Sequence, residues 1–476
     1  MLVRAQPWRE VAATAAQLRW LATHRGEDFP MFLDSAASGE GAAADALGRY
    51  SILFARAEES LLLRGDGRLT RPDGVTSAGD FLGALDAWWL RERLPDAAGE
   101  PVSGDAAGSL PFRGGWAVYL AYELAAQIET GLAIPPLDAD AVCALALRVR
   151  SAIVFDHAVG SCHVVAEAGA EDQLPRLVAA LEQAGPEAGA ARSAPTSPMA
   201  ATPGEQAAEA YRDAVLRAQD YIAAGDIYQA NLSRGWRLAL DARQQDAARL
   251  YESLRRANPA PFAAFATLPG LTILSSSPER LVRVRGGCVD TRPIAGTRPR
   301  SGVLGADRDE KSQLLANPKE RAEHVMLIDL ERNDLGRICR AGSVEVSEFM
   351  VTESYRHVHH IVSNVRGTLN AGVTPGQVLG AVFPGGTITG CPKYRCMQII
   401  GELEREPRGA YTGSLGYLNL DGSMDFNILI RTATLQGGEL EFRAGAGIVA
   451  DSDWQRELAE TRAKAQGMVR AFGGDR

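Results

Sequence analysis

Two pairs of glutamates have a spacing at which both side chains of a pair project from one face of a helix. Glu320 and Glu323 begin the segment ERAEHVMLIDLERND, whose apolar middle is typical of a helix packed on a core. Glu457 and Glu460 repeat the spacing in RELAETRAK, one turn before Lys464. Carboxylates from two helices can form an oxygen site for Mg²⁺, which takes further ligands from water and an anionic substrate. Alternatively, each pair is a solvated acidic helix end.

Two glycine-rich segments have the composition of loops that hold an anion. FPGGTITGCPKYR carries hydroxyl groups at Thr387 and Thr389, and RAGAGIVADS places Gly445 and Gly447 where a backbone can approach a ligand closely. Free backbone N–H groups in such turns suit a carboxylate or a phosphate. Neither segment has Walker or Rossmann spacing, so simple tight turns explain them as well.

A single arginine interrupts an apolar segment that we expect to be a strand. Arg431 lies in FNILIRTATL, downstream of Tyr411. A guanidinium inside such a strand is costly unless it meets an anion. A substrate carboxylate and a structural ion pair meet this requirement equally well.

Three histidines lie close together in RHVHHIVSNV, at His357, His359 and His360, the last at the start of a predicted strand. A His–x–His pair can ligate a metal ion, but the acidic pairs offer a harder site. Neutral core histidines are the competing interpretation.

The composition is that of a globular protein with a large core. The chain has 476 residues, of which 46% are hydrophobic and 23% charged, and a formal net charge of -9. This acidic balance argues against nucleic-acid binding. The N-terminus lacks a signal-peptide pattern and no apolar run is long enough to span a membrane, so we expect a cytoplasmic protein. The scattered cysteines suit a reduced compartment, and Cys391 with Cys396 is a poor zinc motif.

Alternating strand-like runs and hairpin turns predict an α+β fold, with large antiparallel β-sheets packed as a sandwich and helices outside. LDG and QGG are hairpin turn signals in the C-terminal part. The predicted helices after residue 200 cover about 205–224, 308–335, 391–404 and 453–471. The expected regions are an N-terminal region (1–166), a linker or surface loop (167–204) and a catalytic region (205–476), with a further Ala/Gly-rich loop at 36–46.

Nine segments, in order, resemble the chorismate-utilising enzymes, the family that includes component I of aminodeoxychorismate synthase and of anthranilate synthase. They are SSSPER, RPIAGTRPR, ERAEHVMLIDLERNDLGR, HHIVS, FPGGTITGCPKYRCMQII, GAYTGSLGY, MDFNILIRT, AGAGIVADS and ELAETRAK. The resemblance is dense over about 205–470 and looser in the first half of the chain. It implies the anthranilate synthase component I fold, chorismate as the substrate and Mg²⁺ as the cofactor.

The resemblance also implies roles for individual residues. Glu323 and Glu460 would be the metal ligands, with Glu320 and Glu457 holding metal-bound water. The implied catalytic positions are Glu279, as general acid or base at the C4 hydroxyl, His360 beside that group, and Gln229. Gln229 stands where water-using isochorismate relatives carry a lysine base, and a glutamine favours ammonia. The implied substrate-binding positions are Thr387, Tyr411, Arg431, Gly445, Lys464, Ala295, Gly296 and Thr297.

The resemblance further implies a partner that supplies ammonia, because the chain shows no glutamine-amidotransferase nucleophile motif. NPAPF, YQANL, VHHIVS, FLDSA and GGWAVYLAYELAAQIE favour aminodeoxychorismate synthase, which acts in p-aminobenzoate and folate biosynthesis. Ala295 of PIAGT departs from many such enzymes, which carry a lysine nucleophile there, and matches anthranilate synthases. The alternatives are therefore amination at C4 without a covalent step, amination at C2 to give anthranilate for tryptophan biosynthesis, and a non-catalytic scaffold that binds the amidotransferase.

A second ligand site is implied in the N-terminal part. Ser35 of FLDSA and the segment 258–262, with Pro261 and Phe262, resemble parts of a tryptophan pocket. That pocket is regulatory in anthranilate synthase and structural in some relatives. A loop serine and a proline-rich core turn explain the same residues equally well.

Overall fold

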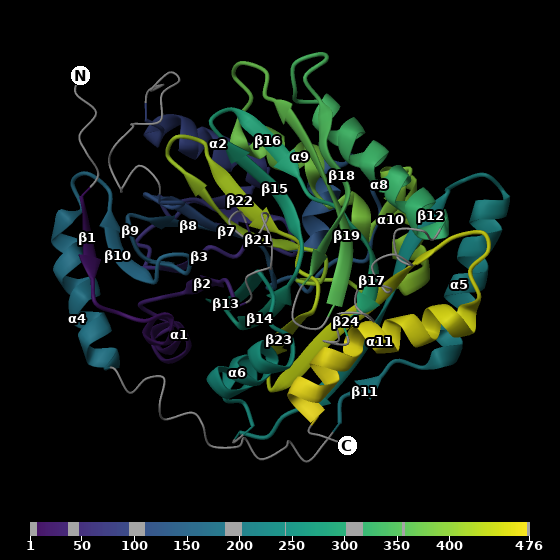
Figure 1. The fold of residues 1–476 in the computed structure, drawn as a ribbon, viewed down its shortest axis with the longest axis horizontal. Coiled ribbons are helices and arrows are strands. Elements are labelled where there is room, and N and C mark those ends of the chain that lie inside the picture. The colour runs from purple at the N-terminus through teal and green to yellow at the C-terminus, as the bar shows by residue number, and fades with distance from the viewer. Residues whose placement is uncertain are drawn as a thin grey trace.

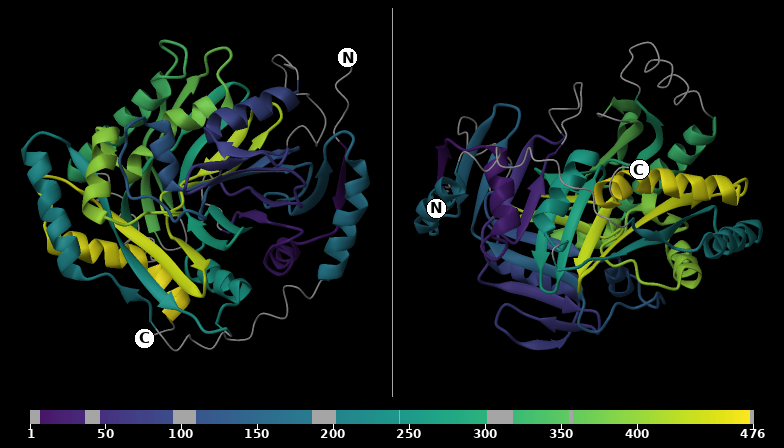
Figure 2. Two further views of the ribbon diagram at one scale, coloured as in Figure 1. Left: turned by 180° about the vertical axis from the view of Figure 1, so that it is seen from behind. Right: turned by 90° about the horizontal axis from the view of Figure 1, so that it is seen from below.

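Antiparallel pairing of short strands builds two large sheets, with helices on their outer sides (Figures 1 and 2). The computed structural model describes residues 7–36, 47–94, 110–185, 202–242, 244–300, 318–354 and 358–473. The predicted α+β sandwich is confirmed. Residues 37–46 of the expected loop, 186–201 of the expected linker and 308–317 of the predicted helix 308–335 lie outside the described residues.

The first sheet has the strand order β1-β10-β9-β3-β2-β13-β14-β23-β24-β12-β11, and β20 pairs with β12. Its strands are β1 (Trp8–Val11), β10 (Ser161–Ala166), β9 (Ser151–Asp156), β3 (Tyr50–Phe54), β2 (Met31–Asp34), β13 (Phe262–Leu268), β14 (Leu271–Ser277), β23 (Thr432–Gln436), β24 (Glu439–Ile448), β12 (Gln229–Ala239), β11 (Gly204–Glu205) and β20 (Gly390–Cys391).

The second sheet has the order β17-β19-β16-β15-β22-β21-β7-β8-β4-β5-β6, and β18 pairs with β19. Its strands are β17 (Ile294–Pro299), β19 (Val358–Thr368), β16 (Cys288–Thr291), β15 (Arg280–Arg285), β22 (Met424–Asn427), β21 (Ser414–Asn419), β7 (Gly115–Leu120), β8 (Val142–Val149), β4 (Ser60–Arg64), β5 (Arg68–Thr70), β6 (Thr76–Ala78) and β18 (Glu345–Ser354).

Both sheets join the N-terminal and C-terminal parts of the chain. In the first sheet β2 pairs with β13, with Leu33 opposite Ala264. In the second sheet β7 pairs with β21, with Tyr119 opposite Leu415. The expected regions 1–166 and 205–476 therefore share two continuous sheets.

The two predicted hairpin turns are present. Gly422 adopts a φ of 81° between β21 and β22, and Gly437 and Gly438 adopt 57° and 83° between β23 and β24. Glycine is needed at such positions because a side chain disfavours positive φ. These turns set the register of the strands that flank the candidate site.

The helices cover the outer faces of the sheets. They are α1 (Ala15–His24), α2 (Phe81–Glu92), α3 (Ala125–Ile128), α4 (Leu174–Ala184), α5 (Ala208–Ala223), α6 (Ala247–Ala257), α8 (Pro318–Gly336), α9 (Pro375–Val382), α10 (Lys393–Glu404) and α11 (Trp454–Gly473), with short 3₁₀ turns η2 (Tyr122–Leu124), η3 (Glu171–Gln173) and η5 (Gly386–Ile388). Capping boxes begin α1 at Thr14 and α9 at Thr374. In the part of the chain that the structure describes, no helix combines the length and apolarity that a membrane span requires.

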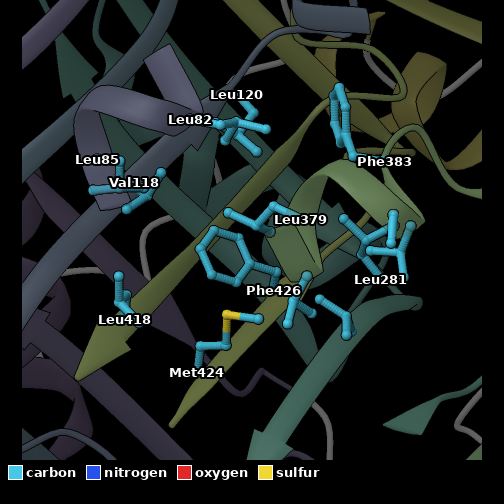
Figure 3. Close-up of a cluster of buried hydrophobic side chains, with 14 of the residues drawn as sticks. Leu82, Leu85, Val118, Leu120, Leu281, Leu379, Phe383, Leu418, Met424 and Phe426 are labelled. Atoms are coloured by element: carbon cyan, nitrogen blue, oxygen red, sulfur yellow. The ribbon is translucent and has the colours of Figure 1, made fainter. Parts of the chain in front are cut away.

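Three layers of apolar side chains fix these elements in place. One layer lies between the sheets and contains Phe54 and Tyr119. A second lies between the first sheet and helices that include α1, α6 and α11. The third, in Figure 3, packs α2 and α9 on the second sheet. Phe383, the residue that follows α9, belongs to this layer and anchors the segment that leads to η5. Burial of each large side chain stabilises the fold by roughly 1.5–3 kcal/mol.

Candidate active site

The candidate site lies where the chain passes from one sheet to the other. Glu279 lies between β14 of the first sheet and β15 of the second, and Arg431 lies between β22 of the second and β23 of the first. The two crossings are bonded to each other. Ile428 N donates to the carbonyl of Glu279 at 3.0 Å, and Ser276 N donates to the carbonyl of Arg431 at 3.1 Å.

The prediction that Arg431 lies within a strand is wrong. β22 ends at Asn427, β23 begins at Thr432, and Arg431 has a φ of 50°. This left-handed conformation is uncommon for a residue with a side chain and costs about 1 kcal/mol or more. Arg431 is therefore part of a bend between the two sheets and not of a strand.

Glu279 is a buried carboxyl whose proton affinity is tuned to neutral pH. Its side chain is 4% exposed, and burial raises its pKa to about 7. Thr387, the N–H of Ile294, and the charges of Arg431 and Lys464 oppose that rise. Within the described ranges, Glu279 Oε1 has no hydrogen-bond partner. A carboxyl of this kind can give up and take back a proton near pH 7.

Arg431 and Lys464 supply positive charge next to this carboxyl. Burial lowers the pKa of Arg431, and the charge of Glu279 counteracts the effect. Lys464 on α11 donates from Nζ to the carbonyl of Gly445 on β24 at 3.0 Å. Two cations and an acid thus converge from three separate segments, as binding of an anionic substrate requires.

Gly445 and Tyr411 form a close-packed wall of the site with Asn231. A Cβ on Gly445 would lie 2.6 Å from Asn231 Oδ1 and 2.9 Å from Tyr411 Oη, too close for any side chain. Burial raises the pKa of Tyr411 to about 12, so its hydroxyl stays a hydrogen-bond donor. The predicted residues Tyr411, Gly445 and Lys464 are therefore in direct proximity.

Gln229 and Asn231 lie on one face of β12, because alternate residues of a strand point the same way. Gln229 is 6% exposed, and a Cβ on Gly447 would lie 2.4 Å from its Nε2. Asn231 Nδ2 is 3.5 Å from the carbonyl of Thr387. Gln229 Oε1 and Asn231 Oδ1 have no hydrogen-bond partner among the described residues. Sequence reasoning missed Asn231, although its place two residues after Gln229 was a usable signal.

A buried ionic network supports this wall from below and was also missed. Arg408 donates to Glu404 at 2.6 Å, to the carbonyl of Ile388 at 3.0 Å and to the carbonyl of Asn231 at 2.7 Å. Glu404 also pairs with Arg443 at 3.3 Å. The network thus connects η5, β12, α10 and β24, all of which carry or adjoin site residues.

His360 and the PIAGT segment lie on paired strands of the second sheet. His360 is buried on β19 opposite Thr297 of β17, and Ala295 is opposite Ile361. The register shifts between Ala295 and Thr297, where Gly296 has a φ of 65°. This shift is a β-bulge, a common way of redirecting side chains next to a site. The side chain of Thr297 lies outside the described residues.

The four predicted metal-binding glutamates lie on α8 and α11. Glu457 is buried and accepts from Ser452 Oγ at 2.7 Å, whereas Glu460 is exposed and pairs with Lys464 at 2.7 Å. Burial raises the pKa of Tyr211, and the charges of Glu457 and Glu460 raise it further, so both glutamates lie within electrostatic range of that ring. Glu323 is half-buried on α8, and the side chain of Glu320 lies outside the described residues.

The donor set suits a hard cation, since all four groups are carboxylates. However, the side chains that the structure describes contain no cluster of three or more Asp, Glu, His or Cys that could hold a metal ion. Glu460 is connected to the site by its ion pair with Lys464. Glu457 and Glu460 also act electrostatically on Tyr211. Magnesium binding remains a prediction.

Comparison with known proteins decides the family. The sequence model described as chorismate binding enzyme matches residues 74–470. The chain belongs to this family. It is 48% identical to the anthranilate synthase component I-like protein of Synechocystis over 264 residues, which span 56% of this chain and 54% of that relative.

Two chorismate-binding relatives match most of the chain at equal identity. Aminodeoxychorismate synthase component 1 of Bacillus subtilis is 39% identical over 442 residues, covering 89% of each protein. Anthranilate synthase component 1 of Pseudomonas putida is 39% identical over 440 residues, covering 89% of this chain and 87% of the relative. The family predicted from the sequence is confirmed, but these identities do not separate the two reactions.

The fold of this chorismate-binding enzyme is that of anthranilate synthase component I. The crystal structure of that protein from Streptococcus pneumoniae TIGR4 superposes with a TM-score of 0.75 at 32% identity. It covers 89% of this chain and 92% of that one. The predicted component I fold is therefore confirmed.

A cavity of about 380 Å³, whose lining does not include Glu279, lies between strands of the first sheet and strands of the second sheet. Ser35, Pro261 and Phe262, the residues predicted to form a tryptophan pocket, all line it. Ser35 Oγ donates to the carbonyl of Tyr50 at 2.7 Å. The structure thus brings the three residues together, and tryptophan as the occupant stays a prediction.

Proposed function

We propose that this chorismate-binding enzyme is the large subunit of aminodeoxychorismate synthase, which replaces the C4 hydroxyl of chorismate with an amino group. The observation that carries the proposal is Glu279, a buried carboxyl with a pKa near 7 that faces Arg431 and Lys464. An allylic hydroxyl leaves poorly unless it is protonated, and an acid titrating near neutral pH serves this step.

The described residues divide the chemistry between them. Glu279 donates a proton to the C4 hydroxyl, the C–O bond breaks, and water departs. Ammonia forms the C–N bond, and the carboxylate of Glu279 takes up the proton that the new amine loses. Arg431 and Lys464 bind substrate carboxylates with the hydroxyl of Tyr411. Mg²⁺ bound by Glu323 and Glu460, with Glu320 and Glu457 around it, would neutralise the ring carboxylate.

The side chain of Gln229 favours ammonia over water as the nucleophile. Gln229 is a neutral amide in a buried position, so it cannot take a proton from water. Ammonia needs no such base because it carries a free lone pair. We therefore propose a glutamine amidotransferase subunit as the partner that supplies ammonia.

Anthranilate synthase component I is the second candidate, and a specific residue favours it. Ala295 has no nucleophile, and the Pseudomonas putida anthranilate synthase is as similar as the aminodeoxychorismate synthase. The pure chain should be incubated with chorismate, MgCl₂ and ammonium chloride. Aminodeoxychorismate is detected as p-aminobenzoate after a lyase is added, whereas anthranilate fluoresces directly. Anthranilate as the main product would refute the first proposal, and unchanged chorismate would support the non-catalytic scaffold.

For the cavity lined by Ser35, Pro261 and Phe262 we propose L-tryptophan as the occupant. Ser35, Pro261 and Phe262 offer a hydroxyl and an apolar ring in a space of suitable size. A bound ligand raises the melting temperature of the folded state. L-tryptophan at millimolar concentration should do so, while L-leucine should not, and equal effects of both would contradict the assignment.

A further inference from the structure

Glu123 is a buried carboxyl that the N-terminal part of the chain brings close to the candidate site. It belongs to η2, which follows β7 after a single residue, and it is 7% exposed. Glutamates are almost never buried this deeply unless their oxygens are satisfied. The oxygens of Glu123 accept hydrogen bonds from backbone N–H groups of a distant segment, which leads to Tyr411.

The N–H groups that Glu123 binds begin the segment 408–413, which connects α10 to β21. Arg408 N donates to Oε1 of Glu123 at 2.7 Å, and Gly409 N donates to Oε1 at 3.3 Å and to Oε2 at 3.1 Å. In the opposite direction, Tyr122 N donates to the carbonyl of Gly409 at 2.9 Å. Two neighbouring residues of η2 thus hold both the N–H and the carbonyl groups of one short stretch of backbone.

The backbone of this segment is strained at Thr412, which has a φ of 63°. A β-branched residue rarely adopts positive φ, and the conformation persists only where neighbouring contacts enforce it. On the C-terminal side, Thr412 N donates to the carbonyl of Leu429 at 2.7 Å. On the N-terminal side, the contacts are those of Glu123. Release of the N–H groups by Glu123 would therefore allow the segment to relax.

The same segment places Tyr411 in the wall of the candidate site. Tyr411 lies two residues after Gly409, and its N–H closes a turn by donating to the carbonyl of Arg408 at 3.0 Å. A Cβ on Gly445 would lie 2.9 Å from Tyr411 Oη, and the carbonyl of Gly445 accepts from Lys464 Nζ at 3.0 Å. The tyrosine hydroxyl and the lysine ammonium group therefore lie next to the same residue of β24.

A purely stabilising role is the competing explanation, and Glu167 shows what such a carboxylate looks like. Glu167 is 6% exposed, and it pairs with the guanidinium of Arg148 at 2.8 Å. A guanidinium at the end of a side chain can follow its partner without moving the backbone. The N–H groups that Glu123 binds are the backbone itself, so the position of this carboxylate determines the position of the segment.

We propose that Glu123 is a positioning residue for chorismate binding: by holding the N–H groups of Arg408 and Gly409, its carboxylate fixes the backbone that places the hydroxyl of Tyr411. The proposal rests on Tyr411 as a substrate-binding residue in the proposed function. The pairing of β7 with β21 brings η2 to this segment. The site formed by the C-terminal part of the chain is therefore incomplete without the N-terminal part.

The first test compares KM and kcat for chorismate consumption in E123Q and wild type. Burial raises the pKa of Glu123 to about 7, so assays at pH 8 keep the wild-type carboxylate ionised. Glutamine has the same shape, but its amide nitrogen cannot accept a hydrogen bond, so one N–H loses its acceptor. We expect KM to rise about tenfold, the size of one lost hydrogen bond, with kcat within about twofold. An unchanged KM, or a lower kcat at constant KM, would overturn the proposal.

Further variants separate positioning from stability. E167Q is the matched control and should lower the melting temperature without raising KM; an equal rise of KM in E167Q would show that the effect is general destabilisation. In Y411F, which lacks the hydroxyl, E123Q should raise KM no further, because the carboxylate acts through that group. An equal rise with and without the hydroxyl would refute the proposal. E123D withdraws the carboxylate by one methylene and should raise KM in the same direction, so it tests the contact if E123Q does not fold.

The second test needs no substrate and is independent of the product. Hydrogen exchange measured by mass spectrometry reports how firmly backbone amides are held. In E123Q the amides of 408–413 should exchange about tenfold faster than in wild type, while those of β7 and β21 stay unchanged. Unchanged exchange in the segment would refute the role of Glu123 even if the chain makes aminodeoxychorismate. Anthranilate as the product would refute only the proposed function and leave this result intact.

Discussion

Replacement of Arg408 by methionine removes the centre of the ionic network beneath the site. Arg408 is 5% exposed, and its guanidinium bonds Glu404 and the carbonyls of Ile388 and Asn231. In R408M the two carbonyls lose their donor, and Glu404 keeps only Arg443 at 3.3 Å as an ionic partner. The methionine side chain fills much of the volume, so the change is mainly one of charge and hydrogen bonding.

The expected cost follows from these contacts. Breaking a buried ion pair costs about 3–5 kcal/mol because the remaining charge is uncompensated, and an orphaned buried carbonyl adds about 1–3 kcal/mol. Arg443 and the Ser233 N–H, which donates to Glu404 at 2.8 Å, still compensate part of the charge. We therefore expect the free energy of unfolding to fall by about 3–5 kcal/mol.

Urea unfolding followed by circular dichroism and by tryptophan fluorescence measures this loss. R237M is the matched control, because Arg237 also forms ion pairs with glutamates, among them Glu406 and Glu441, but its side chain is 51% exposed. An exposed pair contributes about 0–1 kcal/mol. If R408M loses no more stability than R237M, the buried network does not stabilise the site.

Four further results are expected. E279Q should lower kcat by about 10²–10⁴-fold without changing the circular dichroism spectrum, and an active variant would exclude Glu279 as the acid. Because the pKa of Glu279 is raised to about 7, the folded state is penalised as pH rises from 4.5 towards 7, so E279Q should melt above wild type at pH 8; an equal or lower melting temperature would contradict this burial cost. G445A should raise KM for chorismate at least tenfold, because its methyl group meets Asn231 and Tyr411, and a normal KM would show that the wall is not part of the site. E323Q should abolish Mg²⁺-dependent turnover and leave the melting curve unchanged, whereas full activity would remove Glu323 from the metal site.

Local patterns were enough to predict most elements but not their arrangement. α5, α10 and α11 and the LDG and QGG hairpins follow from periodicity and turn residues that act over a few positions. The pairing of β2 with β13 joins residues more than 200 positions apart in sequence, and no local signal specifies it. Even in the well-predicted α8, Val325 of the apolar block is 43% exposed.

The residues of the candidate site that lie in recognised motifs could be predicted from the sequence. The residues whose role depends on their burial could not. Glu279, Tyr411, Gly445 and Lys464 were identified through the resemblance, and the structure brings them together. Arg408 was not identified, because the sequence does not distinguish a buried guanidinium from a solvated one. Only packing distinguishes them, and packing depends on the long-range pairing that the sequence does not reveal.

The sharing of both sheets between distant parts of the chain has a consequence during synthesis. When β2 and β7 leave the ribosome, their pairing edges have no partner until β13 and β21 follow, the latter after residue 413. Folding can finish only near the end of translation, so the nascent polypeptide carries open strand edges for most of its elongation. At high expression, we therefore expect the yield of folded protein to depend on how well these edges are shielded during synthesis.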